Sequence, residues 1–316
     1  MLTGIMAALL AALAWSLNFI VPFVIGDYSV FDFALFRFLI SGLLGCCFLA
    51  CNLKAVRNLR LADWRMAFFL GFIGYLGYFL ALVGAAIYAG PVIAPAFLGL
   101  VPVVLAIAGN WRQHTVPWGD LMLPLSLSAV GLILVNIGSF NPASSTRPES
   151  VVHGIALALA AVSLWTWFGL LNQSVLAKRT QIDAGVWTAL IMVGAGLGML
   201  AFVPVGLLLS VFEIPRLGLR WEIAEPLYIW GTSLAGIASV GGALAWTYAA
   251  QRMPVALSAQ IITIETLFGT IFGLLVRHRW PTLAESFGMT LLLMGVLAVI
   301  RIVYGQQALK LDRGSV

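Results

Sequence analysis

Charged side chains are scarce in this sequence. Of its 316 residues only 9% are Asp, Glu, Lys or Arg, whereas a soluble domain carries about 25%. Apolar residues make up 62% of the chain, and its mean hydropathy is +1.04. Because so few polar side chains could not cover a water-exposed surface, the composition excludes an ordinary soluble enzyme. We expect an integral membrane protein.

Cysteine and histidine are also rare. The three cysteines lie within one apolar run, Cys46–Cys51, which argues against both a disulfide framework and a zinc site. The three histidines, His114, His153 and His278, stand far apart at the ends of apolar runs. None of them has a second ligand at a spacing that holds a metal. The sequence therefore predicts neither a metal nor a cofactor.

Long apolar runs are what the chain has in abundance. A helix needs ~20 apolar residues to cross a hydrocarbon core about 30 Å thick, and it satisfies its own backbone hydrogen bonds in lipid. Ten runs reach that length: Thr3–Ile25, Phe31–Cys51, Trp64–Tyr88, Gly90–Asn110, Trp118–Ile137, His153–Leu176, Gly185–Phe212, Leu227–Ala250, Pro254–Val276 and Leu283–Tyr304. We expect an all-α protein with ten transmembrane helices. The first run is too long for a signal peptide and lacks a basic start, so we predict that it is retained.

The distribution of Lys and Arg predicts the orientation, because cytoplasmic loops carry more of them. With the N-terminus placed inside, we assign twelve to the cytoplasmic side and four to the outside. The outer four are Arg147, Arg216, Arg220 and Arg252, and the inner twelve include Arg277 and Arg279. This bias predicts that both termini are cytoplasmic. It also explains the net charge of +5 without a nucleic-acid partner.

Two stretches of the chain align with one another. Gly90-Pro91-Val92 and Met253-Pro254-Val255 each precede an apolar run, a basic loop and a further helix. The offset between the two copies is 163 residues at the start and 164 after one additional loop residue. A weaker match pairs Trp15 in the first helix with Trp165 in the sixth. The pattern indicates an internal repeat.

The repeat predicts the domain organisation. Because five is an odd number, the second set of five helices must enter the membrane upside down relative to the first. Inverted repeats are typical of secondary transporters, which hold substrate near the middle of the membrane. We predict a first repeat at 1–138, a linker at 139–151, a second repeat at 152–304 and a cytoplasmic tail at 305–316.

The motifs within this framework resemble a known family. Trp15-Ser-Leu-Asn18, Phe36-Arg37-Phe38 and the run from Pro91 to Pro102 are similar to the EamA-type drug/metabolite transporter superfamily. Within it, the chain most resembles the aromatic amino acid exporters of bacterial inner membranes, the YddG type. The resemblance covers the whole chain. It implies a multi-pass inner-membrane carrier whose cavity is lined by helices one, three, four, six, eight and nine, with five and ten outside. One departure is that Glu265 occupies, in helix nine, the place of Pro102 in helix four.

Three residues are candidates for coupling or gating. Glu265 lies near the centre of helix nine, where a charge is expensive, so it serves proton coupling, attracts a substrate ammonium or stays neutral in a structural bond. Arg37 lies inside helix two, where it either binds a carboxylate or gates, or else snorkels or pairs with Asp32. Pro102 lacks an amide hydrogen and predicts a kink or opening in helix four, either flexible or static.

Aromatic and amide side chains at helical spacing form the predicted substrate-binding set. They lie away from the membrane interfaces, where Trp and Tyr are usually anchors, and on helices that the resemblance places around the cavity. The set comprises Trp15, Asn18, Tyr75, Tyr78, Trp165, Phe168, Asn172, Trp246, Gln260 and Thr263. Each could instead be ordinary helix packing. Together they suit an aromatic cargo, because contacts between rings add ~0.5–1.5 kcal/mol to burial.

The function predicted from the sequence is a secondary transporter that exports amino acids with aromatic or bulky apolar side chains by alternating access. A carrier of another small metabolite or drug is the alternative, and a channel or an intramembrane enzyme is a distant one, since Glu265 has no deep His, Asp or Lys beside it. The expected partners are a small-molecule substrate and the lipid bilayer. The sequence does not predict an oligomeric state.

Overall fold

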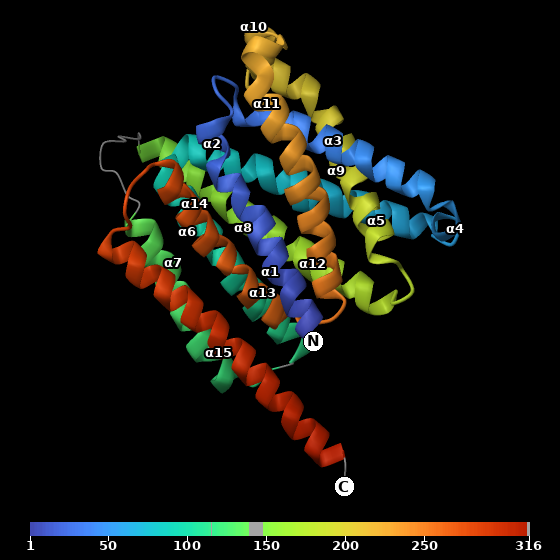
Figure 1. The fold of residues 1–316 in the computed structure, drawn as a ribbon, viewed down its shortest axis with the longest axis vertical. Helices are drawn as coiled ribbons and strands as arrows, with labels where there is room; N and C mark the ends of the chain where they lie inside the picture. Colours follow the sequence, from blue (N-terminus) through green and yellow to red (C-terminus); the bar gives the residue numbers. More distant parts are fainter. Residues whose placement is uncertain (115, 139–147, 315–316) are drawn as a thin grey trace.

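The computed structural model of the chain is entirely helical in the part that it describes (Figure 1). It describes the backbone of residues 1–114, 116–138 and 148–314, and within these ranges it describes all side chains except those of 89–96, 98, 138, 148–150, 303–304 and 306–314. The helices are α1 Leu2–Ser16, η1 Leu17–Ile20, α2 Val21–Val24, α3 Val30–Cys51, α4 Leu53–Val56, α5 Leu61–Gly71, η2 Phe72–Gly77, α6 Tyr78–Gln113, α7 Trp118–Gly138, α8 Pro148–Lys178, α9 Ala184–Leu208, α10 Ile214–Leu217, α11 Trp221–Leu234, η3 Ala235–Gly242, α12 Ala243–Ala250, α13 Val255–Ile262, α14 Ile264–Val276 and α15 Leu283–Gly314. The segment η1 is a 3₁₀ helix, whereas η2 and η3 are π-helices.

Within the described residues, nine spans are long and apolar enough to cross a membrane. They correspond to nine of the ten predicted helices. The tenth prediction, Gly90–Asn110, is the second part of α6 and falls partly on side chains outside the described set. The predicted linker lies largely outside the described residues as well. The last helix, α15, continues through most of the predicted tail to Gly314.

The contacts of α6 with α8 show that the chain returns across the membrane within α6. Three contacts follow one another along α6: Tyr78 with Trp165, Tyr88 with His153, and Gln113 with Gln173. The first part of α6 therefore runs toward the beginning of α8, and the last part runs back toward the end of α8. This reversal places the last part of α6 in the position of predicted helix four, beside the nine spans found among the described residues.

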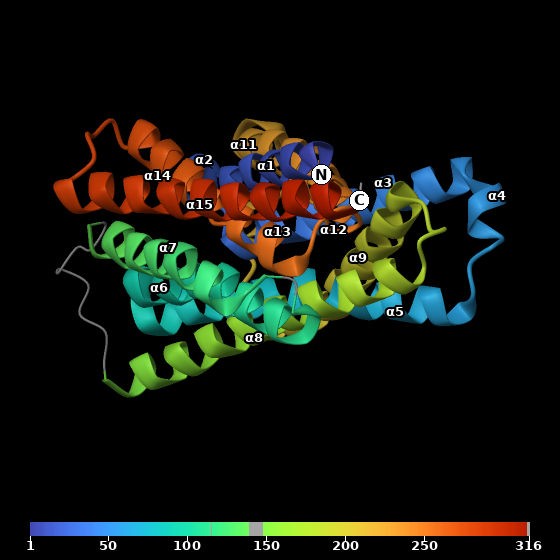
Figure 2. The ribbon, with the colours of Figure 1, turned by 90° about the horizontal axis from the view of Figure 1, so that it is seen from below.

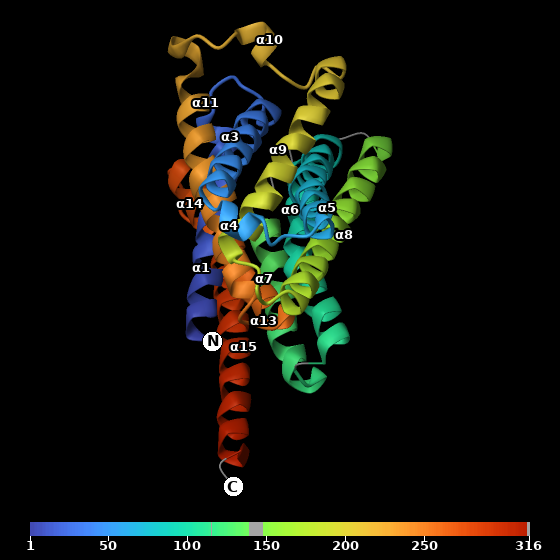
Figure 3. The same cartoon turned by 90° about the vertical axis from the view of Figure 1, so that its right-hand side faces the viewer.

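Two groups of helices pack as separate lobes on either side of the molecule. We call α5, η2, α6 and α8 lobe A, and α1, η3, α12, α13 and α14 lobe B. Helix α8 packs along α6 and η2, while α1 packs against every other member of lobe B. Figures 2 and 3 show the lobes as opposite layers. Each lobe thus combines helices of one predicted repeat with the first helix of the other.

The remaining long helices join the lobes. Helix α3 packs along α9, and α7 packs along α15 at the outside of the molecule. The α7–α15 contact depends on glycine, since a Cβ atom on Gly131 would lie 2.8 Å from the carbonyl oxygen of Gly288. A Cβ on Gly288 would lie 2.7 Å from the carbonyl oxygen of Gly131. Only glycine permits the two backbones to approach so closely.

The π-helices repeat with the spacing found in the sequence. The segment η2 begins at Phe72 and η3 at Ala235, which is 163 residues later. Both lie in the middle of a membrane span, and both contact a tryptophan at the same relative position. Tyr75 of η2 packs against Trp165, and the carbonyl of Ala238 in η3 accepts a hydrogen bond from Trp15. The internal repeat therefore extends to local backbone geometry.

The structure corrects part of the charge count. A Cβ on Gly4 would lie 3.2 Å from the Cβ of Arg252, so this arginine lies at the N-terminal end of the bundle. The guanidinium carbon of Arg277 lies 4.9 Å from the ring centre of Phe23, at the other end of the first span. Arg277 and Arg279 therefore lie on the face opposite the N-terminus, and Arg252 lies on the N-terminal face. The totals become eleven and five, so the bias keeps its direction. The N-terminus and the end of α15 point toward the same end of the molecule (Figures 1 and 3).

Candidate functional site

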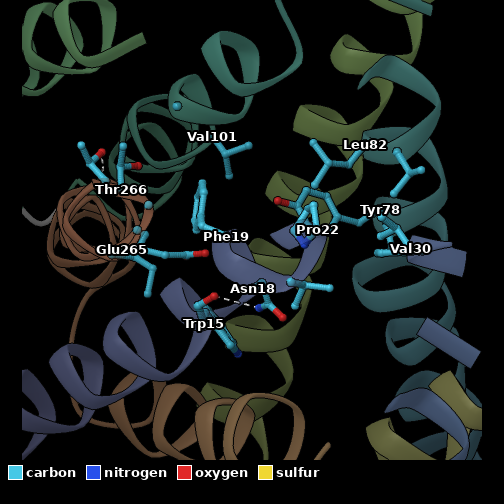
Figure 4. Close-up of a pocket in the computed structure, with 18 of the residues that line it drawn as sticks. Trp15, Asn18, Phe19, Pro22, Val30, Tyr78, Leu82, Val101, Glu265 and Thr266 are labelled. Atoms are coloured by element: carbon cyan, nitrogen blue, oxygen red, sulfur yellow. Dashed lines mark hydrogen bonds between the residues drawn. The ribbon is translucent and has the colours of Figure 1, made fainter. Parts of the chain in front are cut away.

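A cavity of about 670 Å³ lies between the two lobes. It extends from Trp15, near the end of α1, to Arg277, directly after α14 and away from the N-terminus. Figure 4 shows Glu265 and Thr266 on one side of it, Tyr78 and Leu82 on the opposite side, and Trp15, Asn18 and Phe19 between them. Packing closes the other end, where Ala8, Ala12 and Ala259 are fully buried. The cavity is therefore open toward one membrane face only.

Aromatic rings form the floor of the cavity. Trp165 contacts Trp15 edge to face, with ring centres 5.3 Å apart, and its ring centre lies 4.9 Å from that of Tyr78. Tyr75 reaches Trp165 from η2, with ring centres 6.3 Å apart. The indole nitrogen of Trp15 donates a hydrogen bond of 2.9 Å to the carbonyl of Ala238. A regular α-helix uses its carbonyls internally, whereas the π-helix presents this one to the tryptophan.

Arg37 projects from α3 into the cavity wall and is 8% exposed. Its Nε donates to the hydroxyl of Ser239 (2.6 Å), and its Nη1 donates to the Asn18 side-chain oxygen (2.7 Å). Asp32, the partner considered from the sequence, instead accepts hydrogen bonds from Ser29 and from the backbone N–H groups at the start of α10. The guanidinium forms no ion pair with any described residue, so its positive charge is held by neutral groups.

Glu265 lies in the first turn of α14, directly after the break between α13 and α14 at Thr263. It is half-buried and lines the same cavity as Arg37 (Figure 4). No described residue forms a hydrogen bond or an ion pair with its carboxyl group. Arg37 and Tyr78 are the groups with which it interacts electrostatically. An ionisable group inside a membrane protein is a functional candidate by default.

The open end of the cavity carries basic side chains. Arg277 stacks over Phe23, and Arg279 forms two hydrogen bonds with the buried carboxylate of Glu285, at 2.8 and 2.5 Å. These bonds raise the pKa of Arg279 above its ordinary value, because they favour the charged guanidinium. Glu285 also accepts from the backbone N–H of Thr282 and so fixes the start of α15.

At the closed end, amide side chains join the two lobes. The Gln173 side chain of α8 donates a hydrogen bond of 2.6 Å to the carbonyl of Met253 in the loop before α13. The Gln113 side chain of α6 accepts one of 3.3 Å from the backbone N–H of Val255, and it donates another of 3.3 Å to Gln173. The same face carries an ion pair of 2.6 Å between Arg179 and Asp63. Opening this end requires the amide contacts between the lobes to break.

The structure brings together eight of the thirteen residues predicted for the site. Those lining the cavity are Trp15, Asn18, Arg37, Tyr75, Tyr78, Pro102, Trp165 and Glu265. Around Pro102 the backbone of α6 remains α-helical. Helical spacing in the sequence predicted the correct helix faces for these residues. The distances between the residues depend on how the two lobes pack.

The other five predicted residues lie outside the lining, which corrects their assignment to the cavity. Phe168 packs behind Trp165, and Trp246 packs behind Trp15, with ring centres 5.1 and 5.8 Å apart. The Asn172 oxygen accepts from the indole of Trp187, and the Gln260 oxygen accepts from Ser128. Thr263 donates to a carbonyl one turn earlier in its own helix. Helical spacing cannot distinguish a side chain in the cavity from one a single layer behind it.

Sequence reasoning also missed part of the lining. Helix two contributes Phe33 and Phe38 as well as Arg37, helix five contributes Asn136, and the start of α15 contributes Glu285. No residue of helix eight lines the cavity, although Ser239 reaches Arg37 from it. The expected roles of helices two, five, eight and ten were therefore wrong in part. A signal for Asn136 was available, since an amide near the end of an apolar helix is unusual. Among the described residues, no three His, Cys, Asp or Glu side chains gather as metal ligands.

Comparisons with known proteins agree with this architecture. Residues 2–137 match the EamA-like transporter family. The inner membrane protein YtfF of Escherichia coli (strain K12) is 29% identical over 311 residues, a stretch that covers 95% of this chain and 96% of that protein. A crystal structure of a protein 16% identical in sequence superposes with a TM-score of 0.74 and covers 94% of this chain and 96% of the other. At that identity the superposition shows a shared fold only.

The family match points to a transporter, and the full-length relative is an inner membrane protein. The match over residues 2–137 covers the predicted first repeat, and the similarity to YtfF extends over 95% of the chain. The chain therefore contains an EamA-like transporter domain at residues 2–137, and this domain together with the similarity to YtfF supports a place in the drug/metabolite transporter superfamily.

Proposed function

We propose that this transporter exports zwitterionic amino acids with aromatic or bulky apolar side chains. One observation carries the proposal: Arg37 and Glu265 face the same aromatic-lined cavity, and neither forms an ion pair with a described residue. The two groups have opposite charge, as do the carboxylate and ammonium of an amino acid. Free charges in a membrane interior are otherwise unfavourable, so a ligand that neutralises both is the chemistry that best fits the cavity.

The rest of the cavity suits the side chain of such a substrate. Guanidinium binds carboxylate through paired, charge-assisted hydrogen bonds, and Glu265 attracts the ammonium. The floor formed by Trp15, Trp165 and Tyr78 then offers ring contacts to an aromatic side chain. A volume of about 670 Å³ holds an amino acid and some water.

We assign the direction as export across the bacterial inner membrane, with both termini in the cytoplasm. The relative named as an inner membrane protein supports the location, and the excess of Lys and Arg on the N-terminal face supports the orientation of the termini. With this orientation the cavity opens outward. Transport requires the lobes to rock so that the closed end opens and the open end closes, which is alternating access around a central site.

A second role for Glu265 is compatible with the same site. If Glu265 takes up a proton in one state and releases it in the other, a proton gradient drives export. A carrier of another small metabolite or drug is the alternative function, because most of the cavity lining is apolar. Such a cargo would not need both Arg37 and Glu265.

A substrate panel on the purified protein in liposomes tests the proposal. Flux of labelled L-phenylalanine is measured with and without a pH gradient, with other amino acids, decarboxylated amines and uncharged aromatic compounds as competitors. We expect zwitterionic aromatic compounds to compete best, and Arg37→Gln to weaken their competition by about tenfold or more. Equal competition by uncharged compounds, or an unchanged Arg37→Gln variant, would exclude amino acids as the cargo class.

A further inference from the structure

The groups that hold Arg37 are both neutral. Its Nε donates to the hydroxyl of Ser239, which is fully buried in η3, and its Nη1 donates to the amide oxygen of Asn18. Both oxygens fix the plane of the guanidinium, but neither cancels its charge. Proteins usually pair a buried arginine with a carboxylate. Here the nearest acid on the same helix, Asp32, is used by Ser29 and by the backbone of α10.

We infer that the neutrality of Asn18 and Ser239 determines substrate specificity. These two residues position Arg37 but leave its full charge available to the substrate carboxylate. This role rests on the proposed function. The prediction has a sharp consequence at Asn18. A carboxylate at that position would occupy the site of the amide oxygen, 2.7 Å from Nη1, and neutralise the guanidinium internally. The cavity would then bind amines rather than zwitterions.

The experiment compares L-phenylalanine with phenethylamine, which is the same molecule without its carboxylate. Binding of each to purified protein is measured by calorimetry for the wild type and for Asn18→Asp. We expect the Asn18→Asp substitution to weaken the binding of L-phenylalanine by about tenfold or more relative to the binding of phenethylamine, because one charge-assisted carboxylate contact is lost. Ser239→Ala keeps the charge of Arg37 but removes one hydrogen bond that positions the guanidinium. This variant should weaken only the binding of L-phenylalanine, and by a smaller factor.

The chain offers matched controls for both variants. Asn136 lines the same cavity, and like Asn18 it donates to a carbonyl of its own helix, but it does not contact Arg37. Asn136→Asp therefore adds the same charge to the same cavity without neutralising the guanidinium. Ser41→Ala removes a buried hydroxyl from the helix of Arg37, where it bonds only to the Phe38 carbonyl. Ser41→Ala should shift the two ligands by similar factors. Asn136→Asp measures the general effect of a negative charge in the cavity on the two ligands, and Asn18→Asp should exceed that effect for L-phenylalanine.

The outcomes separate this inference from the proposed function. If the wild type binds L-phenylalanine but Asn18→Asp and Asn136→Asp change the preference between the two ligands by the same factor, the specificity role is wrong and the proposed function stands. If the wild type binds neither probe, both fail. Melting curves of each variant show whether it is folded, and the Ser239→Ala against Ser41→Ala comparison decides the question if Asn18→Asp does not fold.

A different observation carries a second inference, about the ends of the cavity. Trp165 follows Trp15 by 150 residues, and Gln173 follows Phe23 by the same number. Arg277 follows Gln113 by 164 residues, the offset of the repeat in this region. The Gln113–Gln173 contact at the closed end and the Arg277–Phe23 contact at the open end are therefore equivalent pairs in the two repeats.

We propose that the Arg277–Phe23 pair is the outer gate, equivalent to the inner latch formed by Gln113 and Gln173. In this structure the inner pair bonds across to Met253 and Val255 and holds the lobes together. The outer pair lies on lobe B, at the mouth of the cavity. When the lobes rock, the outer pair closes against lobe A while the inner contacts separate.

Opposite responses to two substitutions test the second inference. A cysteine is introduced at Thr266, in the cavity, after Cys46, Cys47 and Cys51 are replaced by alanine, and its labelling by a membrane-impermeant maleimide is timed from outside. Gln173→Leu should slow labelling, since it weakens the contacts that keep the cavity open outward. Phe23→Ala with Arg277→Ala should accelerate it. The loss of a hydrogen-bonded contact in the first variant and of a cation–π contact in the second corresponds to about threefold or more in each direction.

The control is Gln251→Leu, which removes a glutamine bond of 3.2 Å to the Ile182 carbonyl on the same face without joining the lobes. It should leave the labelling rate unchanged. If both test variants change the rate in the same direction, or if Gln251→Leu matches Gln173→Leu, the two pairs are not opposing gates.

Discussion

At the scale of single residues, the tryptophans divide into two environments. Trp15 and Trp165 are 4% and 9% exposed and meet in the floor of the cavity, whereas Trp280 is 89% exposed on the loop before α15. Residues of the first kind can contact a substrate, and those of the second kind anchor the helix ends at the interface. The position of a tryptophan in the membrane therefore separates binding from anchoring more clearly than its sequence neighbours do.

We predict that Trp165→Ala weakens transport of aromatic substrates by about five- to tenfold, because a ring contact and its burial are lost. Trp280→Ala should leave the apparent KM unchanged. Flux of labelled L-phenylalanine into liposomes measures both. If the two variants behave alike, Trp165 is a packing residue and not part of the substrate site.

Glu265 permits a second prediction. We expect Glu265→Gln to abolish the pH dependence of flux, because the amide occupies the same space but cannot exchange a proton. The measurement is the ratio of flux with and without a pH gradient, for the wild type and for Glu265→Gln. A retained pH dependence would exclude Glu265 from the coupling role.

At the scale of helices, the regular α-helical backbone is interrupted beside the cavity. The 3₁₀ segment η1, the π-helices η2 and η3 and the break at Thr263 all lie in the middle of membrane spans, next to cavity-lining residues. Irregular backbone is tolerated in a membrane only where protein or a cavity satisfies it. These segments present groups such as the Ala238 carbonyl and the Ser239 hydroxyl, which an α-helix in lipid would bond internally.

Away from the cavity, helix packing should determine stability alone. We predict that Gly131→Val lowers the free energy of unfolding by about 1–3 kcal/mol, because the added methyl groups force α7 away from α15. Gly119→Val is the matched control on the same helix, where an added Cβ meets no atom within 4 Å. Thermal melting in detergent measures the difference. The apparent KM of the folded fraction should not change, since neither glycine lines the cavity.

At the scale of the whole molecule, the two lobes offer a structural basis for the proposed alternating access. Each lobe contains the first helix of one repeat and later helices of the other, so neither repeat can move without displacing part of its partner. The helices that join the lobes, α3 with α9 and α7 with α15, lie outside this arrangement. Rocking can therefore occur without unfolding any helix.

The orientation of the molecule is itself a prediction. We expect a cysteine at Arg277 to react with an impermeant reagent added outside intact cells, and a cysteine at Arg252 to react only in inverted vesicles. The eleven-to-five distribution of Lys and Arg between the two faces is the physical reason, since positively charged loops remain in the cytoplasm. Labelling of both from one side would contradict the membrane crossing by α13 and α14, which lie between the two residues.

Much of the architecture follows from sequence alone. The ten apolar runs and the 163-residue repeat predict the helices and their inverted arrangement, because lipid permits little except a helix and five crossings invert a copy. Helical spacing also identified Trp15, Tyr78 and Trp165. Spacing alone did not separate these from Trp246 and Gln260, which occupy equally plausible faces one layer behind the cavity.

Tertiary structure decided what these residues can do. Only the packing of η3 against α1 and α3 shows that Arg37 is held by Asn18 and Ser239 rather than by Asp32. The apolar composition and the helical spacing of a span depend only on its own burial in lipid, so they can be read from the local sequence. The pairing of Arg37 with Ser239, by contrast, joins residues 202 positions apart, and such a contact exists only once two helices have met.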